Sequence, residues 1–87
     1  MQPRDEFFDR ENRYSLGVDE ESGRHYASIP VSNGVVDYEE YYELTAGQYV
    51  RFLSEPSTAI AFVDECRRRE RDDLLMEQPG TNRGTAV

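Results

Sequence analysis

The chain has 87 residues, and its 18 acidic residues against ten basic ones give a formal net charge of −8 at neutral pH. A chain of this length forms one small domain, which buries only about 60% of the surface that its unfolded form exposes. The negative field repels nucleic acids and anionic membranes and attracts basic proteins. We therefore exclude nucleic acid and membrane surfaces as partners and expect a protein partner that is basic.

Cysteine and histidine each occur once, as Cys66 and His25. A lone cysteine excludes an internal disulfide, and with a single histidine it provides no zinc-binding set, so we expect no metal and no cofactor. The first 13 residues lack an apolar signal core, and no stretch approaches the ~18 apolar residues that a membrane span needs. These features predict a cytoplasmic protein.

Residues 1–13 are rich in charge and contain one apolar pair, Phe7-Phe8. We expect them to form an N-terminal arm or a short helix that places the two rings against the domain or against a second copy. Residues 14–19 then alternate between apolar and small or polar side chains, which predicts a half-buried strand. Further strands are predicted at about residues 24–31 and 35–44, on either side of a hairpin turn.

Asn33-Gly34 predicts that hairpin, because a two-residue type I′ turn needs positive φ at both positions. With these two residues as the loop, Ile29 lies opposite Tyr38, and the register divides the hairpin into a mainly apolar face and a solvated face. A turn at Ser22-Gly23 independently assigns the first strand to the same two faces. Pro30 cannot donate to a ladder, so the first strand is expected to pair with the second mainly before this residue.

Two helices are predicted after the hairpin. Thr45 and Gln48 have the spacing of a capping box, so one helix is expected at about residues 46–54. Pro56 suits the first turn of a second helix at about residues 56–72, whose apolar stripe faces the sheet. The all-charged residues 67–73 cannot belong to the core, and residues 77–87, rich in turn formers, are predicted to be a flexible C-terminal tail.

These elements predict an α+β fold, a three-stranded antiparallel meander with two C-terminal helices packed on one face. Residues 14–76 form a single small domain between loosely held termini. A small core and a free sheet edge also favour a homodimer.

The apolar face of the hairpin contains one misfit, Glu40, flanked by His25, Tyr38 and Tyr42. Burial favours the protonated form of a carboxyl group, so this patch is a candidate acid–base or ligand site, with His25 and Glu40 as the candidate catalytic residues. The alternative is a structural role, in which Glu40 lies near the sheet edge and pairs with Arg51 or a tyrosine hydroxyl.

The solvated face carries two tyrosines within an acidic row. Tyrosine gives a large contact area at a small entropic cost, and carboxylates steer a basic partner. The predicted protein-binding residues are Tyr26, Asp37, Glu39, Tyr41 and Glu43. The alternative is an ordinary solvated sheet face with a stabilising cross-strand tyrosine pair.

Arginines near the end of the chain form a third candidate group. Residues 67–73 contain four arginines and three acids and sum to only +1, which argues against nucleic acid. We expect Arg67, Arg71 and Arg83 to contact a second copy or an anion. The alternatives are a solvated helix end and an inert tail.

No motif in the sequence fixes a chemistry. Size and charge favour a small acidic, non-catalytic protein-binding module, such as an inhibitor, antitoxin or immunity-type binder of a basic protein. Two alternatives stay open: a small enzyme or ligand binder that uses the patch around Glu40, and a purely structural homodimeric subunit.

Overall fold

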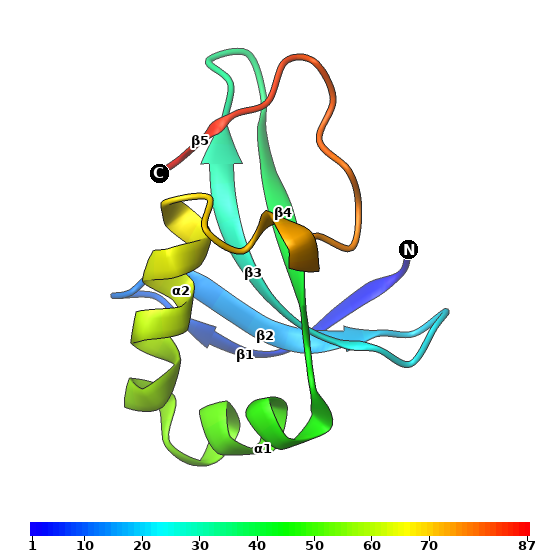
Figure 1. Ribbon diagram of the computed structural model, residues 1–87, viewed down its shortest axis with the longest axis vertical. Helices are drawn as coiled ribbons and strands as arrows, with labels where there is room; N and C mark the ends of the chain where they lie inside the picture. Colours follow the sequence, from blue (N-terminus) through cyan, green and yellow to red (C-terminus); the bar gives the residue numbers. More distant parts are fainter.

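Four antiparallel strands form a sheet in chain order, and two helices pack on one of its faces (Figure 1). The computed structural model describes all residues, 1–87. Its strands are β1 (Pro3–Asp9), β2 (Tyr14–Asp19), β3 (His25–Ser32), β4 (Asp37–Leu44) and β5 (Thr85–Ala86), and its helices are α1 (Ala46–Ser54) and α2 (Ile60–Arg67). Short 3₁₀ helices precede and follow α2, η1 (Pro56–Ala59) and η2 (Asp72–Leu74). The predicted α+β class is confirmed, with one strand more at each end of the chain.

The hairpin of β3 and β4 turns through four residues instead of two. The Asn33 side chain accepts hydrogen bonds from the N–H groups of Val35 and Val36, both at 2.9 Å, and Gly34 takes a φ of 88°. Ile29 therefore lies opposite Glu40, and the predicted pairing with Tyr38 is wrong by two residues. A shift of two keeps every side chain on its face, so the predicted division into two faces is confirmed.

Strands β2 and β3 show the same behaviour. Leu16 lies opposite Ala27, because the turn after β2 has four residues, 20–23, instead of the two of the predicted Ser22-Gly23 turn, and this length keeps the same faces. The Asp19 carboxylate causes the longer turn, since it accepts hydrogen bonds from the Ser22 hydroxyl (2.6 Å) and from the Glu21 N–H (3.2 Å). Hydrogen bonding to Ser22 lowers the pKa of Asp19 to about 2.

Pro30 marks the point where β3 changes its neighbour. Strand β2 pairs with β3 only from His25 to Ser28, and β5 pairs with it at Val31 and Ser32. The Asn33 N–H donates to the Val36 carbonyl, on the β4 side. Backbone N–H groups point alternately to the two sides of a strand, so the N–H positions of the even-numbered β3 residues face β2 and β5. Proline has no N–H to offer there, so the predicted end of pairing before Pro30 is confirmed.

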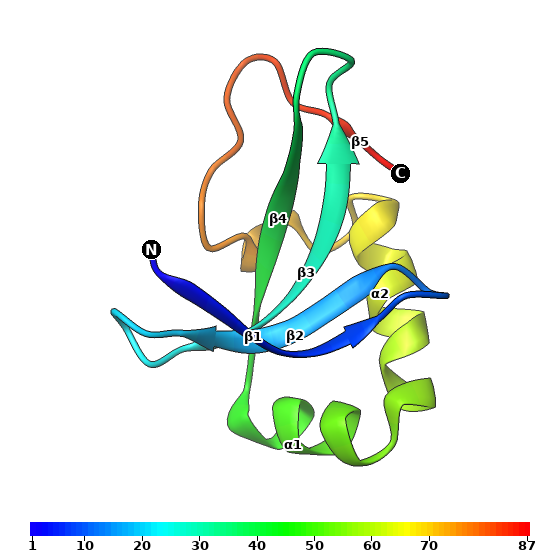
Figure 2. The same cartoon turned by 180° about the vertical axis from the view of Figure 1, so that it is seen from behind.

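The hydrophobic core lies between the helices and the one face of the sheet that they cover (Figures 1 and 2). The predicted apolar face supplies its sheet half, and the two helices with η1 supply the rest. Thirteen buried residues form this core: Tyr14, Leu16, Ala27, Ile29, Val31, Tyr42, Leu44, Tyr49, Phe52, Ala59, Phe62, Val63 and Cys66.

The first helix matches its prediction, and the second is shorter. The capping box of Thr45 and Gln48 is present at the start of α1. Helix α2 ends at Arg67, five residues before the predicted end, because Arg69 adopts a φ of 61°. The N–H of Glu70 then donates to the Glu65 carbonyl, which closes a Schellman motif. The charged segment has no apolar stripe to pack, so the chain turns there.

The N-terminal residues form an edge strand, which corrects the expected arm or short helix. A bulge between Asp5 and Phe7 adds one residue to β1. Phe7 consequently packs against the core, whereas Phe8 points to the opposite face and is 60% exposed. Charged edge residues hide the strand from a search for alternation, but they also protect a free edge from other chains.

Within the predicted C-terminal tail, residues 82–87 contact the rest of the chain, whereas residues 77–81 form no hydrogen bond with it. Met76 donates its N–H to the Tyr41 carbonyl on the outer edge of β4. The chain then crosses the tip of the hairpin and ends as β5 beside β3 (Figures 1 and 2). Its anchor is Arg83, whose contacts are described below.

Tyr26 is fully buried, although its face was predicted to be solvated. It lies opposite Gly17, where the missing side chain leaves room for the ring. Its hydroxyl donates to the Asp5 carboxylate at 2.5 Å, and Tyr41 contacts the ring edge-on with centroids 4.9 Å apart. Tyr26, on β3, therefore contacts all three of the other long strands, β1, β2 and β4.

Replacing Gly17 with alanine is expected to lower the free energy of unfolding by about 2–3 kcal/mol. The new methyl group would overlap the Tyr26 hydroxyl and the Arg4 carbonyl oxygen. Chemical denaturation measures this loss. Gly47→Ala in α1 is the control, since its nearest neighbour lies 4.0 Å away, and it should be neutral or stabilising by about 0.5–1 kcal/mol. Equal stability of both variants would contradict the packing of Tyr26 on β2.

Candidate functional site

The face of the sheet opposite the helices, called the open face below, carries the polar side chains of the strands. No helix packs on it in either view (Figures 1 and 2). Ser15, Tyr26 and Ser28 are buried at its centre. Above them lie more exposed groups from β1, β3 and β4, so any contact with another molecule involves this outer layer.

One part of the open face is an acidic surface, formed by Asp5, Glu39, Tyr41 and Glu77. Burial and the three neighbouring carboxylates together raise the pKa of Tyr41 to about 12. Burial also raises the pKa of Glu39, against the lowering effect of its hydrogen bond from the Ser28 hydroxyl at 3.0 Å. None of the three carboxylates forms an ion pair. The surface therefore presents uncompensated negative charge around a phenol ring.

The structure brings together only some of the predicted protein-binding residues. Glu39 and Tyr41 belong to the acidic surface, whereas Tyr26 lies buried beneath it. Glu43 forms an ion pair with Arg24 at 3.1 Å, and Asp37 is exposed beside the hairpin turn. Sequence reasoning missed Asp5 and Glu77, because they come from segments whose position depends on long-range pairing.

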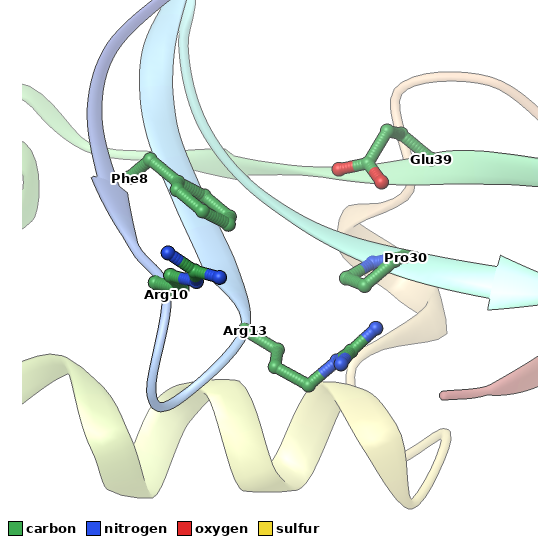
Figure 3. Close-up of a pocket in the computed structure, with 5 residues that line it drawn as sticks. All are labelled: Phe8, Arg10, Arg13, Pro30 and Glu39. Carbon is green, nitrogen blue, oxygen red and sulfur yellow. The ribbon is translucent and has the colours of Figure 1, made fainter.

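The open face also contains the one hollow of the molecule, with a volume of about 350 Å³. Phe8, Arg10, Arg13, Pro30 and Glu39 line it (Figure 3). Arg13 extends toward Pro30, and Glu39 projects from β4 across the opening from the Phe8 ring (Figure 3). The rings of Phe8 and Pro30 thus lie between the two arginines and the Glu39 carboxylate.

Neither arginine of the hollow forms an ion pair with an aspartate or glutamate side chain. The Arg10 side chain has no hydrogen-bond or ion-pair partner, and Arg13 donates its Nε to the backbone oxygen of Val87, the last residue, at 3.1 Å. Glu39 contributes to both the hollow and the acidic surface. The open face therefore has a positive end and a larger negative part, with Phe8 between them.

The candidate catalytic residues are not brought together. His25 lies opposite Leu44 and its ring contacts Tyr49 at 4.4 Å between centroids. Glu40 lies opposite Ile29. Ile29 is four residues beyond His25 on β3, so at the usual rise per residue Glu40 and His25 are about 13 Å apart along the strands. This patch therefore has no geometry for proton transfer between His25 and Glu40.

Glu40 instead holds an arginine from the C-terminal segment. The Arg83 guanidinium donates to both Glu40 oxygens, at 2.8 and 3.0 Å, and the Tyr42 hydroxyl donates to the same carboxylate at 3.0 Å. The other side of the guanidinium donates to Asp72 at 2.7 and 3.0 Å. Hydrogen bonding to Arg83 lowers the pKa of Asp72, and the two carboxylates raise the pKa of Arg83. The structural role of Glu40 is present, with Arg83 in place of Arg51.

The other two arginines proposed as dimer or anion contacts also have partners within the chain. Arg67 pairs with Asp64 at 2.9 Å and donates to the Arg13 carbonyl at 3.1 Å, which ties α2 to the turn after β1. Arg71 pairs with Glu65 at 3.0 Å and lies over the Phe62 ring. All three arginines therefore hold elements of one chain together.

Other chemistry-bearing groups do not form a site. Cys66 is buried, and burial raises the pKa of its thiol to about 12, so the thiolate is not accessible as a nucleophile. No cluster of three or more histidine, cysteine, aspartate or glutamate side chains has an arrangement that holds a metal ion. Neither helix has the length and apolar character needed to span a bilayer.

Comparisons of this chain with protein-family models, with curated proteins and with solved structures found no match.

Arg83→Gln is expected to lower the free energy of unfolding by about 3 kcal/mol, because it leaves the buried Glu40 carboxylate without its cation. Thermal or urea unfolding followed by circular dichroism measures the loss. Arg68→Gln is the matched control, since it breaks an exposed pair with Glu70, and its effect should be much smaller. Similar losses from the two substitutions would show that the buried pair does not stabilise the fold.

Glu39→Gln is expected to raise the melting temperature at pH 7. The folded chain raises the pKa of Glu39 above its ordinary value of 4.5, so this group stabilises the fold fully below pH 4.5 and loses that contribution as the pH rises through the raised pKa. The gain over wild type should therefore vanish near pH 3. Glu55→Gln removes an exposed charge as a control; a gain as large for this variant would assign the effect to net charge alone.

Proposed function

We propose that this protein is a non-catalytic binding module that holds a basic protein partner against its open face. Inhibitor, antitoxin and immunity-type proteins are comparable in size and charge, and the comparison is limited to those two properties. The observation that carries the proposal is the acidic surface, where Asp5, Glu39 and Glu77 lie near Tyr41 and none of them forms an ion pair.

The distribution of arginines supports this reading. Six of the ten arginines form ion pairs with carboxylates elsewhere in the chain: Arg4, Arg24, Arg67, Arg68, Arg71 and Arg83. The acidic surface receives none of them, so its charge remains available to steer a cationic partner.

An apolar contact lies next to this charge. Phe8 is 60% exposed beside the hollow, and aromatic rings supply much of the contact energy in protein interfaces. The hollow accepts an apolar side chain between Phe8 and Pro30, while Arg10 and Arg13 fix orientation by favouring a carboxylate on the partner. A mixed surface of this kind selects one orientation of a basic partner.

The expected behaviour is salt-dependent binding that requires both the charges and the ring. Glu39→Gln with Glu77→Gln should weaken binding about threefold to tenfold at low salt, because each exposed charge contributes about 0.2–1 kcal/mol. Phe8→Ser should weaken it through loss of apolar contact. Both effects can be measured by titration calorimetry with the isolated partner, at about 50 mM and about 500 mM salt.

The partner is isolated first, by photo-crosslinking in the source cells. For this experiment a photo-reactive phenylalanine analogue replaces Tyr41. The same analogue at Val50, which is 61% exposed on α1, is the control for non-specific capture. Val50→Ser and a Glu21→Gln, Glu55→Gln double variant are the controls for the binding measurements. A partner captured equally from both positions, or an affinity indifferent to salt and to Glu39 and Glu77, would refute the proposal.

A further inference from the structure

The last six residues of the chain are bound along their whole length. The Asn82 carbonyl accepts from the Asn33 side chain at 3.2 Å, residues 85 and 86 pair with β3, and the Val87 N–H donates to the Pro30 carbonyl at 3.2 Å. This is the geometry of a peptide that adds a strand to a sheet edge. In both views the segment reaches β3 across the tip of the hairpin (Figures 1 and 2).

Arg83 enters a site that is complementary to a guanidinium group. Its side chain is 14% exposed, and it donates four hydrogen bonds to Glu40 on one side and Asp72 on the other. The planar fork of arginine supplies these paired bonds, which the point charge of lysine cannot reproduce. Glu40, with 6% of its side chain exposed, has no other cation. The site therefore requires arginine.

Gly84 occupies a position with no room for a side chain. A methyl group there would lie 2.7 Å from the backbone carbon of Ser32. The Gly84 N–H donates to the Tyr38 hydroxyl at 2.6 Å, and its carbonyl accepts from Arg69 at 2.9 Å. The site, called the Arg-Gly notch below, is formed by Ser32, Tyr38, Glu40, Arg69 and Asp72. It selects arginine followed by glycine in an extended segment.

The connection that leads to this segment is not held. Residues 77–81 form no hydrogen bond with the rest of the chain, and Pro79-Gly80 lies within them. When a bound segment follows a connection that is not itself bound, the segment can reach the same site on another molecule.

We propose that the Arg-Gly notch binds an Arg-Gly segment in trans, and that the segment is the C-terminal tail of a second copy of this chain. Two copies that exchange residues 82–87 retain every contact described above, because donor and acceptor are identical. The tail of this chain is the segment whose complementarity to Glu40 and Asp72 is established, which is why a second copy is the occupant. Reciprocal exchange gives a homodimer in which each copy supplies Arg83 to the other.

In a single molecule the tail competes with any incoming segment. A short flexible connection holds a tethered group at an effective concentration in the millimolar range. Exchange in the wild-type protein is therefore expected at high concentration, and variants that disable the intramolecular contact expose it at low concentration.

The first test adds the tail as a peptide to full-length Arg83→Gln protein. A peptide of residues 81–87 is expected to raise the melting temperature of this variant saturably and to leave wild type nearly unchanged, because the wild-type notch is occupied. Peptides with Arg83→Lys or Gly84→Ala are matched controls and should give no rise. If Arg83→Gln does not fold alone, refolding on addition of the peptide supports the proposal, and Gly84→Ala protein serves in the same assay.

The second test mixes two full-length variants and identifies the occupant. Glu40→Gln with Asp72→Asn disables the notch and keeps the tail, whereas Arg83→Gln disables the tail and keeps the notch. Native mass spectrometry should show a 1:1 heterodimer in the mixture, at least about tenfold above the dimer fraction of either variant alone.

The outcomes separate clearly. Failure of the peptide to stabilise or refold both the Arg83→Gln and the Gly84→Ala proteins overturns the trans site. Peptide binding with a mixture that stays monomeric overturns the second copy as the occupant. Stabilisation by the lysine or alanine peptides as strong as by the native one overturns the selectivity for Arg-Gly.

Discussion

The buried Glu40 carboxylate determines the course of the chain well beyond its own strand. It lies on the face of the sheet that forms the core, where a charge without a partner is strongly destabilising. Its cation is Arg83, 43 residues further along, and Asp72 holds the other side of the same guanidinium. One arginine, paired with two carboxylates, therefore fixes the hairpin, the turn after α2 and the last strand relative to one another.

Pro30 is the second constraint, and it couples the fold to the open face. Because Pro30 offers no N–H, β2 leaves β3 before it and β5 joins β3 after it. The Arg13 side chain reaches from the turn after β1 to the end of the chain, where its Nε donates to the backbone oxygen of Val87. The hollow forms where β3 changes its neighbour, with Pro30 as one wall. Where the pairing of β2 with β3 ends, β3 thus offers a free edge to β5, and a cavity forms on the open face.

Local chemistry made much of the fold predictable. Asn33-Gly34 fixed a hairpin, Thr45 and Gln48 fixed the start of α1, and the alternation of side chains fixed both faces. The errors arose where distant residues decide. Strand β1 carries its charges on an exposed edge, so it lacks the alternation that would reveal it. The register shifted by two because side chains of Asn33 and Asp19 enlarged their turns. Arg83 was expected to contact a second copy or an anion, because its pairing with Glu40 depends on a fold that brings together residues 43 positions apart.

The charges of this protein fall into two groups with different roles. Most arginines neutralise carboxylates that the fold brings close, as Arg83 does for Glu40 and Arg67 for Asp64. The acids around Tyr41 have no such partner, although Arg10 and Arg13 lie on the same face without an aspartate or glutamate partner. Folding alone would favour pairing these opposite charges. Their separation on one face leaves both ends of that face available to a second molecule with the complementary pattern.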